Sequence, residues 1–114
     1  MGTAFLGCPE ATVSPFYRAR LRAAADDGTE LTRVFTGRPA RAMRNRFITE
    51  MADAEPLDFP LQASLVGPLW RLPNEEARAA FMPVWAGQAA PLVRNLPASE
   101  LVEKLVAEAR SILG

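Results

Sequence analysis

The chain contains no histidine and only one cysteine, Cys8. Without histidine it lacks the commonest general base and the commonest metal ligand of proteins. A single cysteine cannot form an internal disulfide, and with no histidine it cannot form a Cys–His nucleophile. We therefore expect Cys8 to be a small buried residue, and a reducing cytoplasm suits such a chain.

The sequence also lacks an excess of either charge and a long apolar run. Thirteen basic and 13 acidic side chains balance, whereas nucleic-acid-binding domains normally carry a net basic face. No apolar run approaches the roughly 20 residues of a membrane span, and the N-terminus has no secretory-signal pattern. We predict a cytoplasmic protein that binds neither nucleic acid nor membrane.

The residues that are present predict one small, mostly helical domain. The chain has 114 residues, of which 49% are hydrophobic and 23% charged, and this favours a folded core over disorder. It shows no Walker motif, no glycine fingerprint of dinucleotide-binding folds and no metal-ligand spacing. Its chemistry must therefore be sought in less common motifs.

Capping residues and apolar periodicity predict the secondary structure. Ser14-Pro15 begins a helix that reaches Ala25, and Asn74 caps a short helix that ends at Phe81. Pro97 begins the last helix, which carries one apolar stripe. The other expected elements are a strand end over Thr3–Leu6, a strand or extended connector over Thr32–Thr36, and helices over Ala40–Ala54 and Leu61–Trp70.

A chain that begins at a strand and continues as helices is similar to the tail of an α/β barrel. A complete (β/α)₈ barrel needs roughly 250 residues, more than this chain has. A lone strand also leaves backbone groups without partners. We therefore expect an α/β fold class in which this piece is mostly α with one or two short strands.

Gly2 and Thr3 form the first candidate ligand contact. Glycine at a strand end lets the backbone approach a ligand, and the threonine hydroxyl and N–H can donate to a phosphate oxygen. Barrels often bind phosphate at the loops after their last strands. The alternative is a translation start followed by a buried strand, and these two residues alone favour it.

Five arginines and no acid lie between positions 33 and 46. They could contact an anion, form a basic helix for RNA, or lie on a solvated face and pair with distant acids. Overall neutrality and a single aromatic residue in the expected helix, Phe47, favour the solvated face.

Gly87 and Gln88 form the second candidate contact. Small residues around Gln88 suggest a tight backbone segment that positions one amide, which can both donate and accept hydrogen bonds toward a substrate or a flavin edge. The alternative is a loop in which Trp85 packs into the core and Gln88 caps a helix.

Together these stretches resemble the nitronate monooxygenase family, formerly called 2-nitropropane dioxygenases. Any one motif is weak, but the ordered set is fairly specific and runs over essentially the whole chain. The matching stretches are Met1-Gly2-Thr3-Ala4-Phe5-Leu6, Phe35-Thr36-Gly37-Arg38-Pro39-Ala40-Arg41, Asn45-Arg46-Phe47, Phe59-Pro60-Leu61-Gln62 and Trp85-Ala86-Gly87-Gln88-Ala89-Ala90-Pro91-Leu92.

The resemblance implies an FMN-binding (β/α)₈ TIM barrel with a helical substrate-binding region, which oxidises alkyl nitronates with O₂. It implies that Gly2 and Thr3 contact the FMN phosphate and that Gly87 and Gln88 return near the flavin or substrate. On this basis residues 1–30 are the end of a late barrel strand and its helix. Residues 31–97 are the helical substrate-binding region and return loop, and residues 98–114 are the C-terminal amphipathic helix.

The family's catalytic base is a histidine, and this chain has none. The resemblance therefore implies a C-terminal fragment with no catalytic residue of its own, inactive without the remaining barrel segment. One alternative is a fragment of the flavin-type enoyl-acyl-carrier-protein reductase, which shares a similar strand end and Asn-Arg-Phe region. Another is a non-catalytic helical interaction module with exposed apolar surface, and a third is a small RNA-binding protein that uses Arg38–Arg46.

Overall fold

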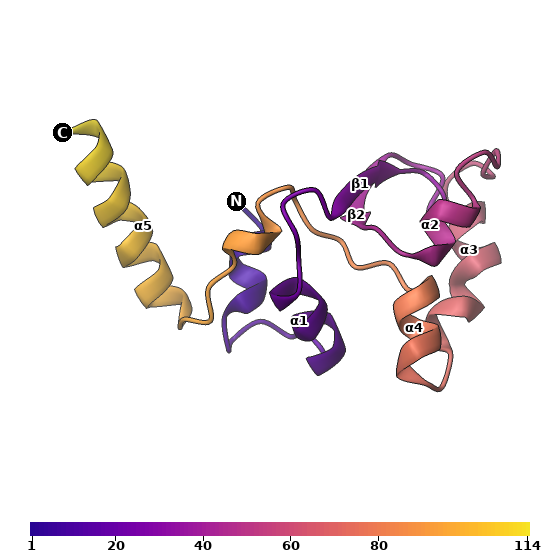
Figure 1. Ribbon diagram of the computed structural model, residues 1–114, viewed down its shortest axis with the longest axis horizontal. Coiled ribbons are helices and arrows are strands. Elements are labelled where there is room, and N and C mark those ends of the chain that lie inside the picture. The colour runs from indigo at the N-terminus through magenta and orange to yellow at the C-terminus, as the bar shows by residue number, and fades with distance from the viewer.

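The computed structural model describes residues 1–114 as an elongated, mostly helical body with one small sheet (Figure 1). Its extents are 48 × 29 × 24 Å and its radius of gyration is 15.9 Å. A compact chain of this length would have a radius of about 13 Å. Helix α5 lies apart at one end of the molecule, and the sheet with α2, α3 and α4 lies at the other.

The elements follow one another closely along the chain. Five are α-helices, two are strands and three are short 3₁₀ helices. In chain order they are η1 Thr3–Gly7, α1 Pro15–Arg22, β1 Thr29–Thr32, β2 Ala40–Met43, α2 Arg46–Glu50, α3 Leu61–Val66, η2 Gly67–Arg71, α4 Glu75–Phe81, η3 Ala90–Leu92 and α5 Ala98–Leu113.

The helix starts that were predicted from capping residues are confirmed. The Ser14 hydroxyl accepts a hydrogen bond from the N–H of Tyr17 at 3.2 Å, and Pro15 is the first helical residue. The Asn74 side chain accepts from Ala77 N at 2.6 Å. Both caps satisfy an N–H that a helix start otherwise leaves without a partner.

The strand expected over Thr3–Leu6 is wrong, because residues Thr3–Gly7 form the 3₁₀ helix η1. No other strand of this chain lies beside the segment, since the only sheet pairs β1 with β2. Local bonds therefore satisfy its backbone, with Phe5 N donating to Gly2 O at 3.0 Å and Cys8 N to Phe5 O at 3.1 Å.

The helix expected over Ala40–Ala54 is wrong in its first part. Ala40–Met43 is strand β2, which pairs antiparallel with β1, and only Arg46–Glu50 is helical. Ladder bonds to β1 override the helix propensity of the local residues. The turn between the strands contains Gly37 at φ +86°, where the backbone of Leu57 leaves no room for a Cβ. Of the strand or connector expected over Thr32–Thr36, Thr32 ends β1 and residues 34–36 form a turn.

Two small clusters of buried side chains form the core. The larger centres on Phe35, which is fully buried and lies 5.3 Å from the Phe47 ring and 5.4 Å from the Trp85 ring, measured between ring centroids. The smaller cluster contains Leu21 of α1 and Val84. The loop between α4 and η3 therefore contributes a residue to each cluster, Trp85 to the larger and Val84 to the smaller, and joins the two clusters.

Replacing Phe35 by alanine removes the centre of the larger cluster. We expect Phe35→Ala to lower the free energy of unfolding by about 3 to 5 kcal/mol, because it loses aromatic contacts and leaves a cavity. The exposed Leu61 provides the control, and Leu61→Ala should change stability by less than about 0.5 kcal/mol. Urea titrations followed by circular dichroism measure both, and equal effects would contradict this description of the core.

Candidate functional site

The two segments singled out as candidate contacts lie together in one cavity. Gly2 and Thr3 line it at the start of η1, and Gly87 and Gln88 line it from the loop before η3. Its volume is about 480 Å³, and α5 forms its far wall. The remaining lining residues are Met1, Ala4, Ala89, Leu92, Val93, Arg94, Leu101, Leu105 and Glu108.

One hydrogen bond joins these segments directly. The N–H of Gly87 donates to the Thr3 hydroxyl oxygen at 2.9 Å, across 84 positions of sequence. The threonine hydroxyl accepts in this bond, so its own hydrogen remains available to donate. A Cβ on Gly2 would meet no atom within 4 Å, so this position is open toward any group that approaches it.

The segment that carries Gly87 is held by strand β2. Val84 O accepts from Met43 N at 2.8 Å, and Ala86 N donates to Arg41 O at 3.2 Å. A β-bridge between Ala42 and Trp85 lies between these bonds. The segment therefore extends the hairpin by a short third strand, and this fixes the direction in which Gly87 leaves it.

Helix α1 holds both candidate segments through adjacent side chains. The Tyr17 hydroxyl donates to the carbonyl of Trp85, two residues before Gly87. Burial raises the pKa of this phenol above its usual value, and its bond to the Trp85 carbonyl lowers it by less. Arg18 donates to four carbonyl oxygens at the end of η1 and in the loop after it, those of Leu6, Gly7, Cys8 and Ala11, at 2.8 to 3.3 Å.

An ion pair ties α5 to the cavity. Arg94 donates to the two carboxylate oxygens of Glu108 at 2.7 and 3.0 Å. Hydrogen bonding to Arg94 lowers the pKa of Glu108, and the same bond raises the pKa of Arg94. Near the start of α5 the Glu10 carboxylate accepts from Ala98 N. These contacts hold a helix whose only fully buried residue is Leu101.

Gln88 and Trp85 behave differently within the same loop. Trp85 packs against Phe35, as the structural interpretation of this stretch expected. Gln88 is exposed and does not cap η3, whose N-cap is Ala89 without a side-chain bond. The Gln88 amide therefore lines the cavity with no hydrogen-bond partner from the protein, free to meet a ligand.

Most of the arginines between positions 33 and 46 have structural partners. Three pair with exposed acids at 2.6 to 3.5 Å, in the pairs Arg33–Glu55, Arg44–Glu30 and Arg46–Glu50. Arg38 lies 3.9 Å from the centroid of the Phe59 ring. The solvated-face interpretation is confirmed for these four, and only Arg41 differs, because it turns toward Thr29.

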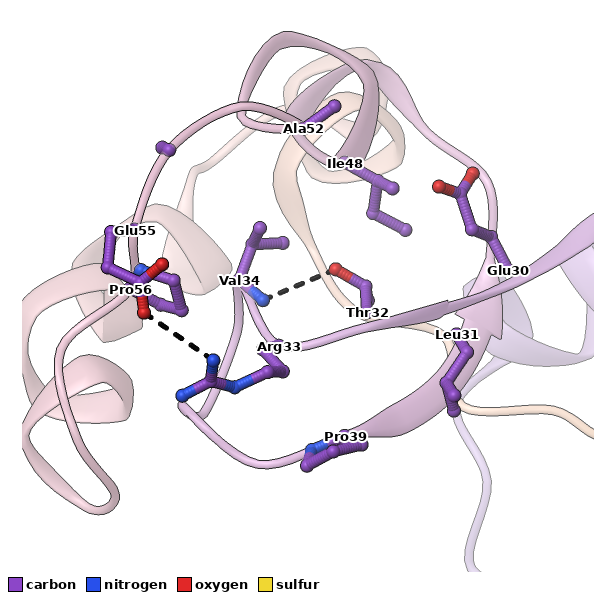
Figure 2. A pocket seen from close by; sticks show the side chains of 11 residues that line it. Glu30, Leu31, Thr32, Arg33, Val34, Pro39, Ile48, Ala52, Glu55 and Pro56 are labelled. Carbon is purple, nitrogen blue, oxygen red and sulfur yellow. Dashed lines mark hydrogen bonds and ion pairs between the residues drawn. The ribbon is translucent and has the colours of Figure 1, made fainter.

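A second cavity is lined by residues of β1 and of the segment 52–56, and none of the candidate residues lines it (Figure 2). Arg33 and Glu55 pair across it, and Val34 N donates to the Thr32 hydroxyl at 3.2 Å. Its third charged residue, Glu30, pairs with Arg44 outside the cavity lining, so each charged group of the lining has a partner. The cavity at Thr3 and Gly87 is the better candidate, because it contains an unused hydroxyl donor and an unused amide.

Sequence reasoning did not single out Tyr17, Arg94 or Glu108, although all three hold the site. Tyr17 and Arg18 were part of an ordinary amphipathic helix pattern, and Arg94 and Glu108 are 14 residues apart. No local spacing marks such contacts, because each depends on how distant segments pack.

The structure contains no helix that is both long and apolar enough to cross a membrane.

A family model, nitronate monooxygenase, matches residues 1–108. The chain belongs to this family. The resemblance that the ordered motifs indicated is thereby confirmed, and it covers the cavity residues as well as most of α5.

Curated members of the family align with nearly all of this chain. It is 35% identical to a probable nitronate monooxygenase of Staphylococcus saprophyticus over 99% of its length, which is 32% of that protein. It is 38% identical to the nitronate monooxygenase of Pseudomonas aeruginosa over 96% of its length, again 32% of that protein. The chain thus spans about a third of the length of the curated relatives it matches.

Solved structures agree. The chain superimposes with a TM-score of 0.86 and 39% identity on nitroalkane oxidase from Streptomyces ansochromogenes, covering all of this chain and 34% of that one. FabK from Thermotoga maritima matches with a TM-score of 0.72 and 27% identity, over 99% of this chain and 37% of that one. These neighbours are TIM-barrel enzymes, so the predicted fold class, part of such a barrel and itself mostly helical, is confirmed.

Removing the Thr3 hydroxyl should leave the Gly87 N–H without its hydrogen-bond acceptor. We expect Thr3→Val to speed hydrogen exchange of the Gly87 amide by about 3- to 10-fold, since a hydrogen bond of this kind contributes about 0.5 to 1.5 kcal/mol. Thr3→Ser keeps the hydroxyl and is the control, with exchange close to that of the unchanged chain. Amide exchange followed by NMR measures this. Equal exchange in all three chains would show that the contact does not form.

The Arg94–Glu108 pair should make the attachment of α5 depend on acid pH. The pKa of Glu108 is lower in the folded chain than in the unfolded one, so its contribution is present above its ordinary pKa and is lost as pH falls through the folded value. We expect Arg94→Gln to return the pKa of Glu108 toward its usual value. Carboxyl ¹³C shifts measured against pH test this, and an unchanged titration curve in the variant would contradict the pairing.

Proposed function

We propose that this chain is the C-terminal part of an FMN-dependent nitronate monooxygenase, which oxidises alkyl nitronates with O₂. Family membership and the shared third of each relative's length support the proposal. The neighbour in Streptomyces ansochromogenes is a nitroalkane oxidase, which acts on a closely related class of nitro compounds. The remaining barrel segment is then the principal partner of this chain.

The bond between Thr3 and Gly87 is the observation that carries the proposal. It brings the motif expected to contact the FMN phosphate beside the motif expected near the flavin or substrate. Gly2 and Thr3 fit a phosphate, because the Thr3 hydroxyl has a hydrogen to donate. In addition, the N–H groups at the start of η1 have no carbonyl to bond within the helix.

Gln88 could contact a part of the flavin or substrate other than the phosphate. Its exposed amide, on the same side of the cavity as Gly87, can donate to one oxygen or nitrogen and accept from another. We propose that Gly87 brings the backbone close to the flavin or substrate and that Gln88 orients the nitronate or the flavin edge. Neither residue transfers a proton at neutral pH.

When bound, FMN would supply the electron-transfer chemistry, and this chain's residues would bind and orient. The resemblance implies a histidine base, and the chain contains no histidine. We therefore propose that it has no catalytic residue and is inactive alone. We propose that residues 1–30 come at the end of a late barrel strand and include the helix that follows it, α1. Residues 31–97 form the helical substrate-binding region and return loop, and residues 98–114 form the C-terminal amphipathic helix.

The alternative within the flavin barrels is the flavin-type enoyl-acyl-carrier-protein reductase. The similarity to FabK, at 27% identity, supports it less than the 39% identity to nitroalkane oxidase supports the first proposal. Oxygen uptake with an alkyl nitronate, as opposed to NADH-dependent reduction of an enoyl thioester, distinguishes the two in the intact enzyme.

A fluorescence titration of FMN with the 114-residue chain tests the proposal. We expect no stoichiometric binding at micromolar concentrations, because Gly2 and Thr3 offer one phosphate contact and not a whole flavin cradle. We also expect no oxygen uptake when FMN and an alkyl nitronate are added. Tight binding of one FMN per chain, or turnover by the isolated chain, would overturn the assignment as an incomplete part of the enzyme.

A further inference from the structure

Arg41 lies next to the contact between the two candidate segments. It is the second residue of β2, and its carbonyl oxygen accepts from Ala86 N at 3.2 Å. The next residue, Gly87, donates to the Thr3 hydroxyl. The main chain of Arg41 is therefore linked to Thr3 through one backbone hydrogen bond, one peptide unit and one side-chain hydrogen bond.

The guanidinium of Arg41 forms hydrogen bonds through only one of its three nitrogen atoms. Nη1 donates to the carbonyl and the hydroxyl oxygens of Thr29, at 3.2 and 3.4 Å. Nε and Nη2 make no hydrogen bond, and Arg41 forms no ion pair, unlike its neighbours Arg33, Arg44 and Arg46. The partly buried guanidinium therefore has N–H donors that remain free, and no carboxylate balances its positive charge.

Arg41 and Thr3 line the same hollow, which has a volume of about 510 Å³. No residue of α5 lines this hollow, unlike the cavity that contains Gln88. No carboxylate lines it. Its third polar side chain is Tyr17, whose hydroxyl already donates to the Trp85 carbonyl. The hollow thus presents a fixed cation, an unused hydroxyl donor and no negative charge. The remaining lining residues are Gly2, Leu6, Trp85, Ala86 and Gly87.

We propose that Arg41 and Thr3 together bind an oxyanion, with Arg41 supplying the charge and Thr3 a hydroxyl donor. A guanidinium presents donors in a planar fork that matches two oxygens of one group, as in a phosphate monoester or a nitronate. The proposal rests on the proposed function, because FMN carries the first group and the substrate carries the second. It assigns Arg41, the last residue of the stretch Phe35–Arg41, a role in binding an anion.

Titration with inorganic phosphate, followed by ¹H–¹⁵N NMR of the 114-residue chain, tests the site. We expect saturable shifts of the Arg41 Nε–H and the Thr3 amide signals. Arg41→Gln should weaken binding about tenfold or more, since hydrogen bonds to charged groups contribute about 1.5 to 3 kcal/mol. Arg41→Lys keeps the charge without the fork and should lie between the two.

Arg38→Gln is the matched control. Arg38 is an exposed arginine of the same hairpin without an acid partner, and it lies over the Phe59 ring away from the hollow. Its removal changes the net charge as Arg41→Gln does, and phosphate should bind as before. Equal weakening in both variants, or shifts that never saturate, would overturn the proposal. Circular dichroism of each variant establishes that it remains folded.

Parallel titrations identify the source of the oxyanion. The phosphate monoester is the source if FMN shifts the Arg41 signal and riboflavin does not. The substrate is the source if an alkyl nitronate saturates the shift at a lower concentration than phosphate does. No shift with any of these anions would sink the inference, even if the intact enzyme proves to be a nitronate monooxygenase. Phosphate binding at Arg41 would sustain it even if the intact enzyme showed no activity toward nitronates.

Discussion

The hydrogen bond from Gly87 N to the Thr3 hydroxyl is the contact on which the candidate site depends. It joins η1, near one end of the chain, to the loop before η3, 84 residues later. Both segments consist of short turns, and α1 also holds each of them, one through Tyr17 and the other through Arg18. Because the bond leaves the threonine hydrogen free, the same side chain can fix the loop and still donate to a ligand.

Hydrogen bonds and the smaller apolar cluster together hold this region in place. That cluster includes Ala86 and Ala90, and Leu6 of η1 packs against it. Tyr17 fixes the Trp85 carbonyl, Arg18 fixes the loop after η1, and β2 pairs with residues 84–86. These polar contacts fix the direction of the loops, and the loss of any one of them removes a specific hydrogen bond worth about 0.5 to 1.5 kcal/mol.

The sequence predicted those parts of the fold that local chemistry determines. Helix starts at Ser14 and Asn74 followed from capping side chains, and the ordered motifs indicated the family. The strand at Thr3–Leu6 and the helix from Ala40 were wrong, because backbone pairing with distant segments, or its absence, decided them. Arg41 was grouped with the solvated arginines for the same reason, since only the fold places it beside Thr3.

A nuclear Overhauser effect between the Gly87 amide proton and the β or methyl protons of Thr3 tests the central claim most directly. In a uniformly labelled chain we predict a strong cross-peak, because the N–H points at the hydroxyl oxygen at 2.9 Å. Its absence, with both signals assigned and well resolved, would show that the two segments do not meet. The candidate site would then not exist as described.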